Sequence, residues 1–123
     1  MDRHETGIKR ITEILGDTIN DTIKKFDKIS PDFSNNIVDF VYGKVYSRPG
    51  ISDKTRELIA VTSMISQGNT GLPLKAHLKG MLRAGWTEEE IKETIIFIAV
   101  YAGFPNAVNA IVTAENVFTE IKE

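Results

Sequence analysis

The fold is decided by the stretch Leu74-Lys75-Ala76-His77-Leu78-Lys79-Gly80 and by two others, Thr55-Arg56-Glu57-Leu58-Ile59 and Ala99-Val100-Tyr101-Ala102-Gly103-Phe104-Pro105. Each sets one or two polar groups among apolar residues that recur at steps of three and four, the spacing of an amphipathic helix. His77 lies at the margin of one apolar stripe and Glu57 at the edge of another. No segment shows the period of two that marks a β-strand. The sequence therefore predicts an all-α fold.

Start and stop signals place the helices. Residues 4–29 share one apolar stripe, and Gly16 either divides it into two helices or leaves one long, slightly broken helix. Ser30-Pro31 opens a helix that ends before residue 47. Its predicted apolar stripe consists of Ile37, Phe40, Val41 and Val45. Further helices are expected over residues 53–67, from Pro73 to Gly85, from Thr87 to 102, and over about 105–121.

The last of these segments is apolar nearly all round for three turns. A helix without a polar face is expected to be buried on all sides. A small domain surrounds such a helix with difficulty, so we expect contacts between subunits to help cover it.

Length and composition narrow the class of protein. The 123 residues predict one domain, residues 1–123, with a single core, and the net charge of −2 shows no basic stripe for nucleic acid. The absence of cysteine excludes disulfides, thiolate nucleophiles and cysteine-ligated zinc. Two histidines, one of them the terminal His4, predict no metal site. The polar N-terminus and the lack of a long apolar run predict neither a signal peptide nor a membrane span, and hence a cytoplasmic protein.

From about residue 32 to 118 the sequence resembles the carboxymuconolactone decarboxylase family, the branch of the AhpD-like fold that lacks thiols. The three stretches above carry the resemblance, together with Met81-Leu82-Arg83-Ala84-Gly85 and Thr87-Glu88-Glu89-Glu90-Ile91. It implies a protomer of about six or seven helices that assembles into a ring-like homo-oligomer, a trimer or hexamer. Residues 1–30 lie outside it and are interpreted as an N-terminal helical extension of the 32–118 core.

The other branch of the family carries a glutamate, a Cys-x-x-Cys pair, and a histidine four residues after the second cysteine. Counted back from His77, the cysteine positions hold Thr70 and Pro73 here, and Glu57 matches the glutamate. The chain is therefore not expected to act as a thiol peroxidase or a disulfide reductase.

The resemblance implies decarboxylation of 4-carboxymuconolactone or a related small acid without metal or organic cofactor. Loss of CO₂ leaves an electron pair delocalised on a lactone dienolate, and catalysis then needs donors at the oxyanion and an acid that protonates carbon. His77 is the predicted acid/base, with Glu57 as its partner. Tyr101, Arg56, Lys75 and Arg83 are the predicted substrate-binding residues, the basic ones for a substrate carboxylate.

Most of these residues also have a structural interpretation. His77 would serve as a core histidine bonded to backbone, and Glu57 as a charge that complements the start of its helix. Tyr101 would be a packing residue with a satisfied hydroxyl, and Lys75 and Arg83 part of a solvated face. The alternative function that follows is a non-catalytic helical oligomer that binds a small ligand or a protein partner.

Overall fold

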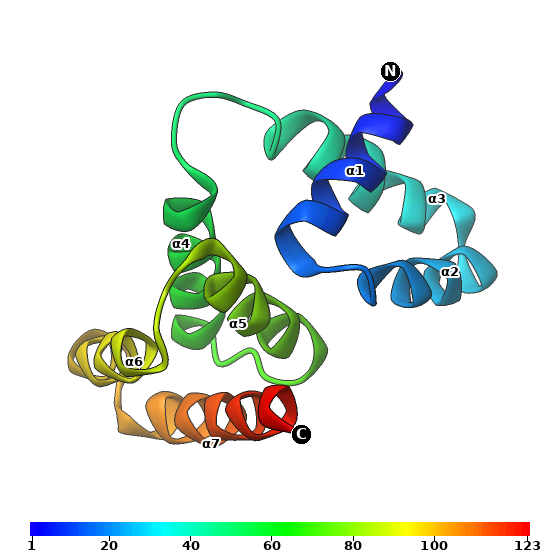
Figure 1. Ribbon diagram of the computed structural model, residues 1–123. Coiled ribbons are helices and arrows are strands. Elements are labelled where there is room, and N and C mark those ends of the chain that lie inside the picture. Colours follow the sequence, from blue (N-terminus) through cyan, green and yellow to red (C-terminus); the bar gives the residue numbers. More distant parts are fainter. The chain divides into compact units, whose positions relative to one another are not determined.

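The structure is a computed structural model that describes residues 1–123, and every regular element in it is a helix (Figure 1). The all-α prediction is confirmed. The elements are α1 (Arg3–Leu15), α2 (Ile19–Ile29), α3 (Pro31–Asn35), the π-helix η1 (Asn36–Val45), α4 (Asp53–Ser66), α5 (Leu72–Ala84), α6 (Glu88–Ala102) and α7 (Phe104–Lys122). None of them combines the length and the apolar character that crossing a membrane requires.

The predicted helix ends agree with the structure wherever a local signal was strong. Gly16 ends α1 with φ at 91°, so of the two interpretations of residues 4–29 the one with two helices is confirmed. The Ser30 hydroxyl accepts a hydrogen bond from the Phe33 amide at 3.3 Å and so caps α3. Gly85 ends α5 in the left-handed region, where glycine pays no Cβ penalty.

A reciprocal pair of hydrogen bonds opens α6, as predicted. The Glu90 amide donates to the Thr87 hydroxyl, and the Thr87 amide donates to the Glu90 carboxylate, both at 3.0 Å. The bond from the Thr87 backbone is the main reason that the pKa of Glu90 lies below its ordinary value of 4.5.

This cap predicts a pH dependence of stability. A carboxylate whose pKa is lower in the folded chain stabilises the fold above its unfolded pKa, and that contribution is lost as the pH falls through the folded pKa. Between about pH 6 and about pH 3, the unfolding free energy of Glu90→Gln should therefore fall less than that of the wild type. Urea titrations at each pH measure this. The control is Glu93→Gln, one turn further along α6, because Glu93 is exposed and makes no ion pair. If Glu93→Gln flattens the profile equally, the cap is not the cause.

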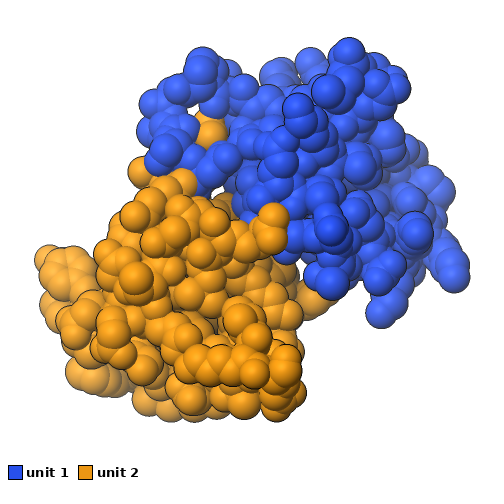
Figure 2. Space-filling view, viewed as in Figure 1, with its two compact units in different colours: residues 1–53 blue, residues 54–123 orange.

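The contacts of the chain group into two compact units, residues 1–53 and residues 54–123 (Figure 2). Each unit has its own apolar core. In the first unit the core is formed by Ile11, Ile14, Leu15, Ile23, Val38 and Tyr42. The second core draws on α4, α5, α6 and α7. The prediction of one domain, divided into residues 1–30 and 32–118, stays a prediction.

In the first unit α1 packs against η1, and the π-helix changes which residues face inward. Val38 and Tyr42 are the buried side chains of η1, whereas Phe40 is 53% exposed and Val45 is 40% exposed. The predicted stripe is therefore wrong at Phe40 and Val45, whereas its other two members, Ile37 and Val41, pack against the core. The prediction assumed the α-helical period. In a π-helix the hydrogen bonds join residues five apart, as where the Tyr46 amide donates to the Val41 carbonyl. This bonding widens each turn and so changes which residues face inward.

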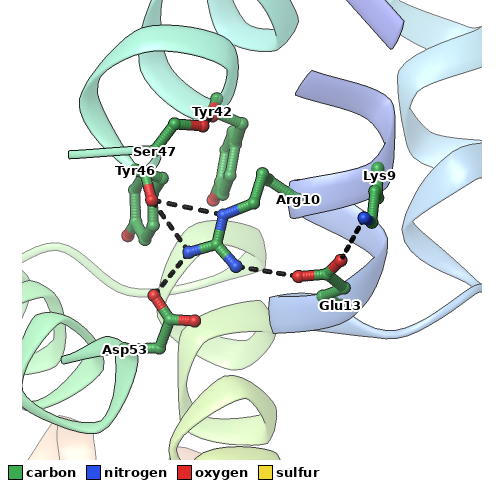
Figure 3. Close-up of polar contacts among 7 residues, drawn as sticks. All are labelled: Lys9, Arg10, Glu13, Tyr42, Tyr46, Ser47 and Asp53. Carbon is green, nitrogen blue, oxygen red and sulfur yellow. Dashed lines mark hydrogen bonds and ion pairs between the residues drawn. The ribbon is translucent and has the colours of Figure 1, made fainter. Parts of the chain in front are cut away.

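Arg10 of α1 binds the segment that follows η1 (Figure 3). Its guanidinium donates to the Tyr46 carbonyl from Nε at 3.2 Å and from Nη2 at 2.8 Å. It also pairs with Asp53 at 2.6 Å and with Glu13 at 2.8 Å. The hydrogen bond to Asp53 is the first of the contacts that raise the pKa of Arg10. The planar guanidinium of Arg10 thus holds both ends of the loop after η1, Tyr46 and Asp53, beside α1.

In the second unit α6 and α7 lie side by side, joined at Gly103, and α5 packs against α7 (Figure 1). Buried residues of α7 recur at three and four positions: Ala107, Ala110, Ala114, Val117 and Phe118. The opposite side of the helix is open, since Val108 is 55% exposed and Val112 is 56% exposed. The single chain therefore leaves one side of α7 uncovered, and the prediction that contacts between subunits help to cover it stays a prediction.

Candidate functional site

The predicted pair of His77 and Glu57 is formed. Glu57 lies on the inward side of α4 with Val61 and Ile65, and its side chain is 0% exposed. His77 lies on α5, is 13% exposed, and its Nδ1 is 2.8 Å from Glu57 Oε1. Because a carboxylate can only accept, Nδ1 carries the donated proton. Nε2 is then the nitrogen that remains for proton exchange.

The burial of this pair has an energetic consequence. A carboxylate removed from water must be hydrogen-bonded or paired, and removing one partner of a buried pair costs about 3 to 5 kcal/mol. The bond therefore ties α4 to α5 and also sets the orientation of the imidazole. A carboxylate behind an imidazole fixes its tautomer and stabilises its protonated form. The arrangement suits an acid/base group.

Lys75, one of the predicted substrate-binding residues, is engaged within the chain. Its ammonium hydrogen-bonds the carboxylate of Glu120 near the end of α7, and Lys79 lies 3.3 Å from the other oxygen of that carboxylate. The bond from Lys75 is the leading cause that lowers the pKa of Glu120. An ammonium carries three donors, so this bond leaves two of them for another acceptor.

The other predicted binding residues are distributed around the unit. Arg56 is half-buried at the start of α4, and Arg83 is exposed in the last turn of α5. Tyr101 is 82% exposed, its hydroxyl makes no hydrogen bond, and its ring lies 5.6 Å from that of Phe97. The interpretation of Tyr101 as a packed residue with a satisfied hydroxyl is thus not what the single chain shows. The structure brings together His77 and Glu57 but does not bring Tyr101 to them.

An open groove of about 390 Å³ runs between α4 and α6. It is lined by Leu58, Thr62, Glu93, Thr94, Phe97 and Ile98. Neither His77 nor Glu57 is part of this lining, and the only ionisable side chain in it is an acid, Glu93. The Glu93 carboxylate would repel a carboxylated ligand, so the groove is poorly suited to one. Sequence reasoning missed it, because threonine and glutamate beside an apolar stripe are indistinguishable from an ordinary solvated helix face.

No group of three or more histidine, aspartate and glutamate side chains is arranged to hold a metal ion. At the positions where thiol relatives carry their cysteines, Thr70 precedes α5 and Pro73 lies in its first turn. Neither position supplies a thiol, because the chain has no cysteine.

Comparisons with known proteins show what the chain is similar to. Residues 31–116 match the sequence model of the carboxymuconolactone decarboxylase family. The chain is 33% identical over 120 residues to the 4-carboxymuconolactone decarboxylase of Acinetobacter baylyi, covering 97% of this chain and 89% of that protein. It is 27% identical over 118 residues to a nitrosuccinic acid decarboxylase of Metarhizium robertsii, covering 95% and 82%. An uncharacterized 15.0 kDa protein of Paracoccus denitrificans is 29% identical over 102 residues, covering 82% and 76%.

Proposed function

The chain belongs to the carboxymuconolactone decarboxylase family, and from that premise we propose that it is a cofactor-free decarboxylase of a small carboxylic acid. The observation that carries the proposal is the 2.8 Å bond between His77 and the fully buried Glu57. It supplies an oriented imidazole, the group that donates and accepts protons most readily near neutral pH.

The two named relatives suggest the substrate class. One is a decarboxylase of 4-carboxymuconolactone and the other of nitrosuccinic acid. In each acid, the carbon that loses CO₂ is connected to a group that accepts an electron pair, an unsaturated lactone in the first and a nitro group in the second. We propose that this chain acts on an acid of the same kind.

The reaction proceeds in two steps. The C–CO₂ bond breaks, CO₂ leaves, and the electron pair passes to the acceptor group as a dienolate or nitronate. Protonated His77 then transfers its Nε2 proton to a carbon of that anion, and the imidazole takes a proton from water to reset. Glu57 stabilises the protonated ring from the Nδ1 side. Arg56, Lys75, Arg83 and Tyr101 are the proposed substrate-binding groups.

The same proposal includes self-association into a ring-like homo-oligomer, a trimer or hexamer. What supports it is the open side of α7, where Val108 and Val112 are more than half exposed. Covering the exposed part of such aliphatic side chains with a second chain removes apolar surface from water and is therefore favourable.

A second function rests on a different observation. The groove between α4 and α6 excludes His77 and Glu57 from its lining. A helical oligomer that binds a small ligand or a protein partner there, without catalysis, would need no acid/base pair beside the groove.

An assay of CO₂ release separates the two functions. Purified protein should decarboxylate 4-carboxymuconolactone or nitrosuccinic acid at a rate proportional to enzyme concentration and unchanged by EDTA. No turnover of either acid, with the protein folded, would reject the proposed activity and leave the binding function. A rate that EDTA abolishes would reject the cofactor-free mechanism alone.

A further inference from the structure

The groove between α4 and α6 has the size of a site for a small molecule. Its volume of about 390 Å³ lies within the roughly 300 to 1,000 Å³ that is usual for such sites. Of its lining, Ile98 is buried in the core of the second unit, and Leu58 packs against that core. These two side chains therefore give the groove an apolar floor that does not depend on surface loops.

The groove and the pair of His77 and Glu57 lie on different sides of α4. Successive residues of an α-helix point about 100° apart, so Leu58 does not share the direction of Glu57. Glu57 is directed to His77 of α5, whereas Leu58 and Thr62 line the groove together with residues of α6. A ligand in the groove therefore lies apart from the acid/base pair.

Glu93 gives the groove a negative charge that no other lining side chain offsets. It is the one ionisable residue of the lining, and it makes no ion pair. The lysines that precede the lining residues on these helices are engaged elsewhere. On α6, Lys92 pairs with Glu89 at 3.3 Å, and on α4, Lys54 lies 4.6 Å from the centre of the Trp86 ring. The charge of the groove therefore favours a cation over an anion.

Two hydroxyl groups line the same groove, one from each helix. The Thr94 hydroxyl donates its proton to the Glu90 carbonyl at 2.8 Å, so toward a ligand its oxygen can only accept a hydrogen bond. The Thr62 hydroxyl, on α4, makes no hydrogen bond within the chain and can accept one as well. Together with the Glu93 carboxylate these oxygens offer three acceptors. A primary ammonium is a compact head group with three donors, and so matches them in number and charge.

The remainder of the lining is apolar and suits a hydrocarbon chain. Phe97 is 65% exposed, so its ring offers surface to a ligand in addition to the floor formed by Leu58 and Ile98. Contact with these three side chains removes the hydrocarbon of a ligand from water. A cation close to the face of an aromatic ring is also attracted by it. The groove thus combines an apolar surface with acceptors for one positive charge.

We propose that the groove binds a small primary amine in its protonated form, with a short hydrocarbon chain. The ammonium binds the Glu93 carboxylate and the two threonine hydroxyls, and the chain covers the apolar floor and the Phe97 ring. Such amines are protonated at neutral pH, as the lysine side chain is. This rests on the second function proposed above, ligand binding in the groove, and adds to it the chemical class of the ligand. Because the groove is open to water, its ion pair is screened, and the expected dissociation constant is on the order of 1 mM.

NMR titrations of the ¹⁵N-labelled full chain with n-pentylammonium, 1-pentanol and pentanoate test the proposal. The three probes have similar hydrocarbon chains and differ in the charge of the head group. With n-pentylammonium, the amide signals of residues 58–62 and 93–98 should shift, and the cation should bind about two to five times as tightly as the alcohol. Pentanoate should bind more weakly than either. Absence of shifts, or shifts confined to other residues, would overturn the site. Equal binding of the cation and the alcohol would reject the amine and leave the groove as a site for an uncharged ligand.

A matched pair of substitutions tests the role of the charge. Glu93→Gln keeps the shape of the side chain and removes its charge. It should raise the dissociation constant of n-pentylammonium by about two- to fivefold and leave that of 1-pentanol unchanged. The control is Glu115→Gln, at an exposed acid of α7 outside the lining, which should change neither value. An equal loss of cation binding in both variants would show that net charge alone attracts the amine, and would overturn the proposal. Binding is measured without turnover, so failure of the decarboxylase activity and failure of the amine site give different results.

Discussion

Substitution of His77 by alanine is expected to lower kcat/KM for decarboxylation by about 10² to 10⁴-fold, the contribution typical of a positioned general acid. The reason is the arrangement around the ring: it is 13% exposed, and Glu57 holds its Nδ1 at 2.8 Å. Without the imidazole, the carbanion left by CO₂ must take its proton from water. Steady-state rates of CO₂ release, measured on whichever acid the wild type accepts, give the ratio.

His4→Ala is the matched control, because His4 is the only other histidine of the chain. It lies at the surface and pairs with Asp39 at 2.7 Å. Its loss should leave kcat/KM unchanged. A fall of similar size in both variants would point to general damage, and an unchanged rate in His77→Ala would end the acid/base role.

A structural role of His77 has to be separated from a chemical one, because removing His77 also breaks a buried pair and so lowers the stability of the fold. Replacing both residues, Glu57→Leu with His77→Leu, removes the charge together with its partner, and such exchanges are often neutral for stability. The double variant should remain folded by circular dichroism and be inactive. Added free imidazole should restore part of the rate of His77→Ala, an effect that a merely structural histidine would not show.

Some of this architecture was predictable because short-range chemistry determines it. Thr87 and Glu90 form their cap as the sequence predicted, and Gly16 and Gly85 end helices. Such features involve residues only a few positions apart, so the sequence itself displays the partners. The pair of His77 and Glu57 was predicted for another reason, the family resemblance of the stretches that contain them.

Other features depend on long-range packing that a periodic pattern does not encode. Phe40 faces outward in the π-helix η1, and no residue type in the sequence predicts a π-helical turn. The apolar character of α7 was visible in the sequence, but which of its residues meet the core was not, because an apolar residue looks the same in sequence whether it is buried or exposed. Engagement of Lys75 by Glu120 joins residues far apart in the chain. The groove beside Thr62 and Thr94 likewise requires two helices to be placed in space.

The close contact between α1 and η1 leads to the largest expected effect on stability. Gly7 is buried, and a Cβ built on it would lie 2.0 Å from the carbonyl oxygen of Val38 and 2.8 Å from its carbonyl carbon. Both atoms are backbone, so no side-chain rotation can relieve the clash. Gly7→Ala would force the two helices apart and open the core around Ile11 and Tyr42.

We expect Gly7→Ala to lower the unfolding free energy by about 3 kcal/mol or more, the upper range for overpacking. Alanine is the better helix former by only about 1 kcal/mol, so the steric term determines the sign. Gly50→Ala is the control: nothing lies within 4 Å of the Cβ that it would add, and a change within about 0.5 kcal/mol is expected. Urea titrations of both variants measure the difference. Equal stabilities would mean that α1 and η1 do not approach as closely as the structure shows, whereas a loss confined to Gly7→Ala would establish their contact as the determinant of the first unit's stability.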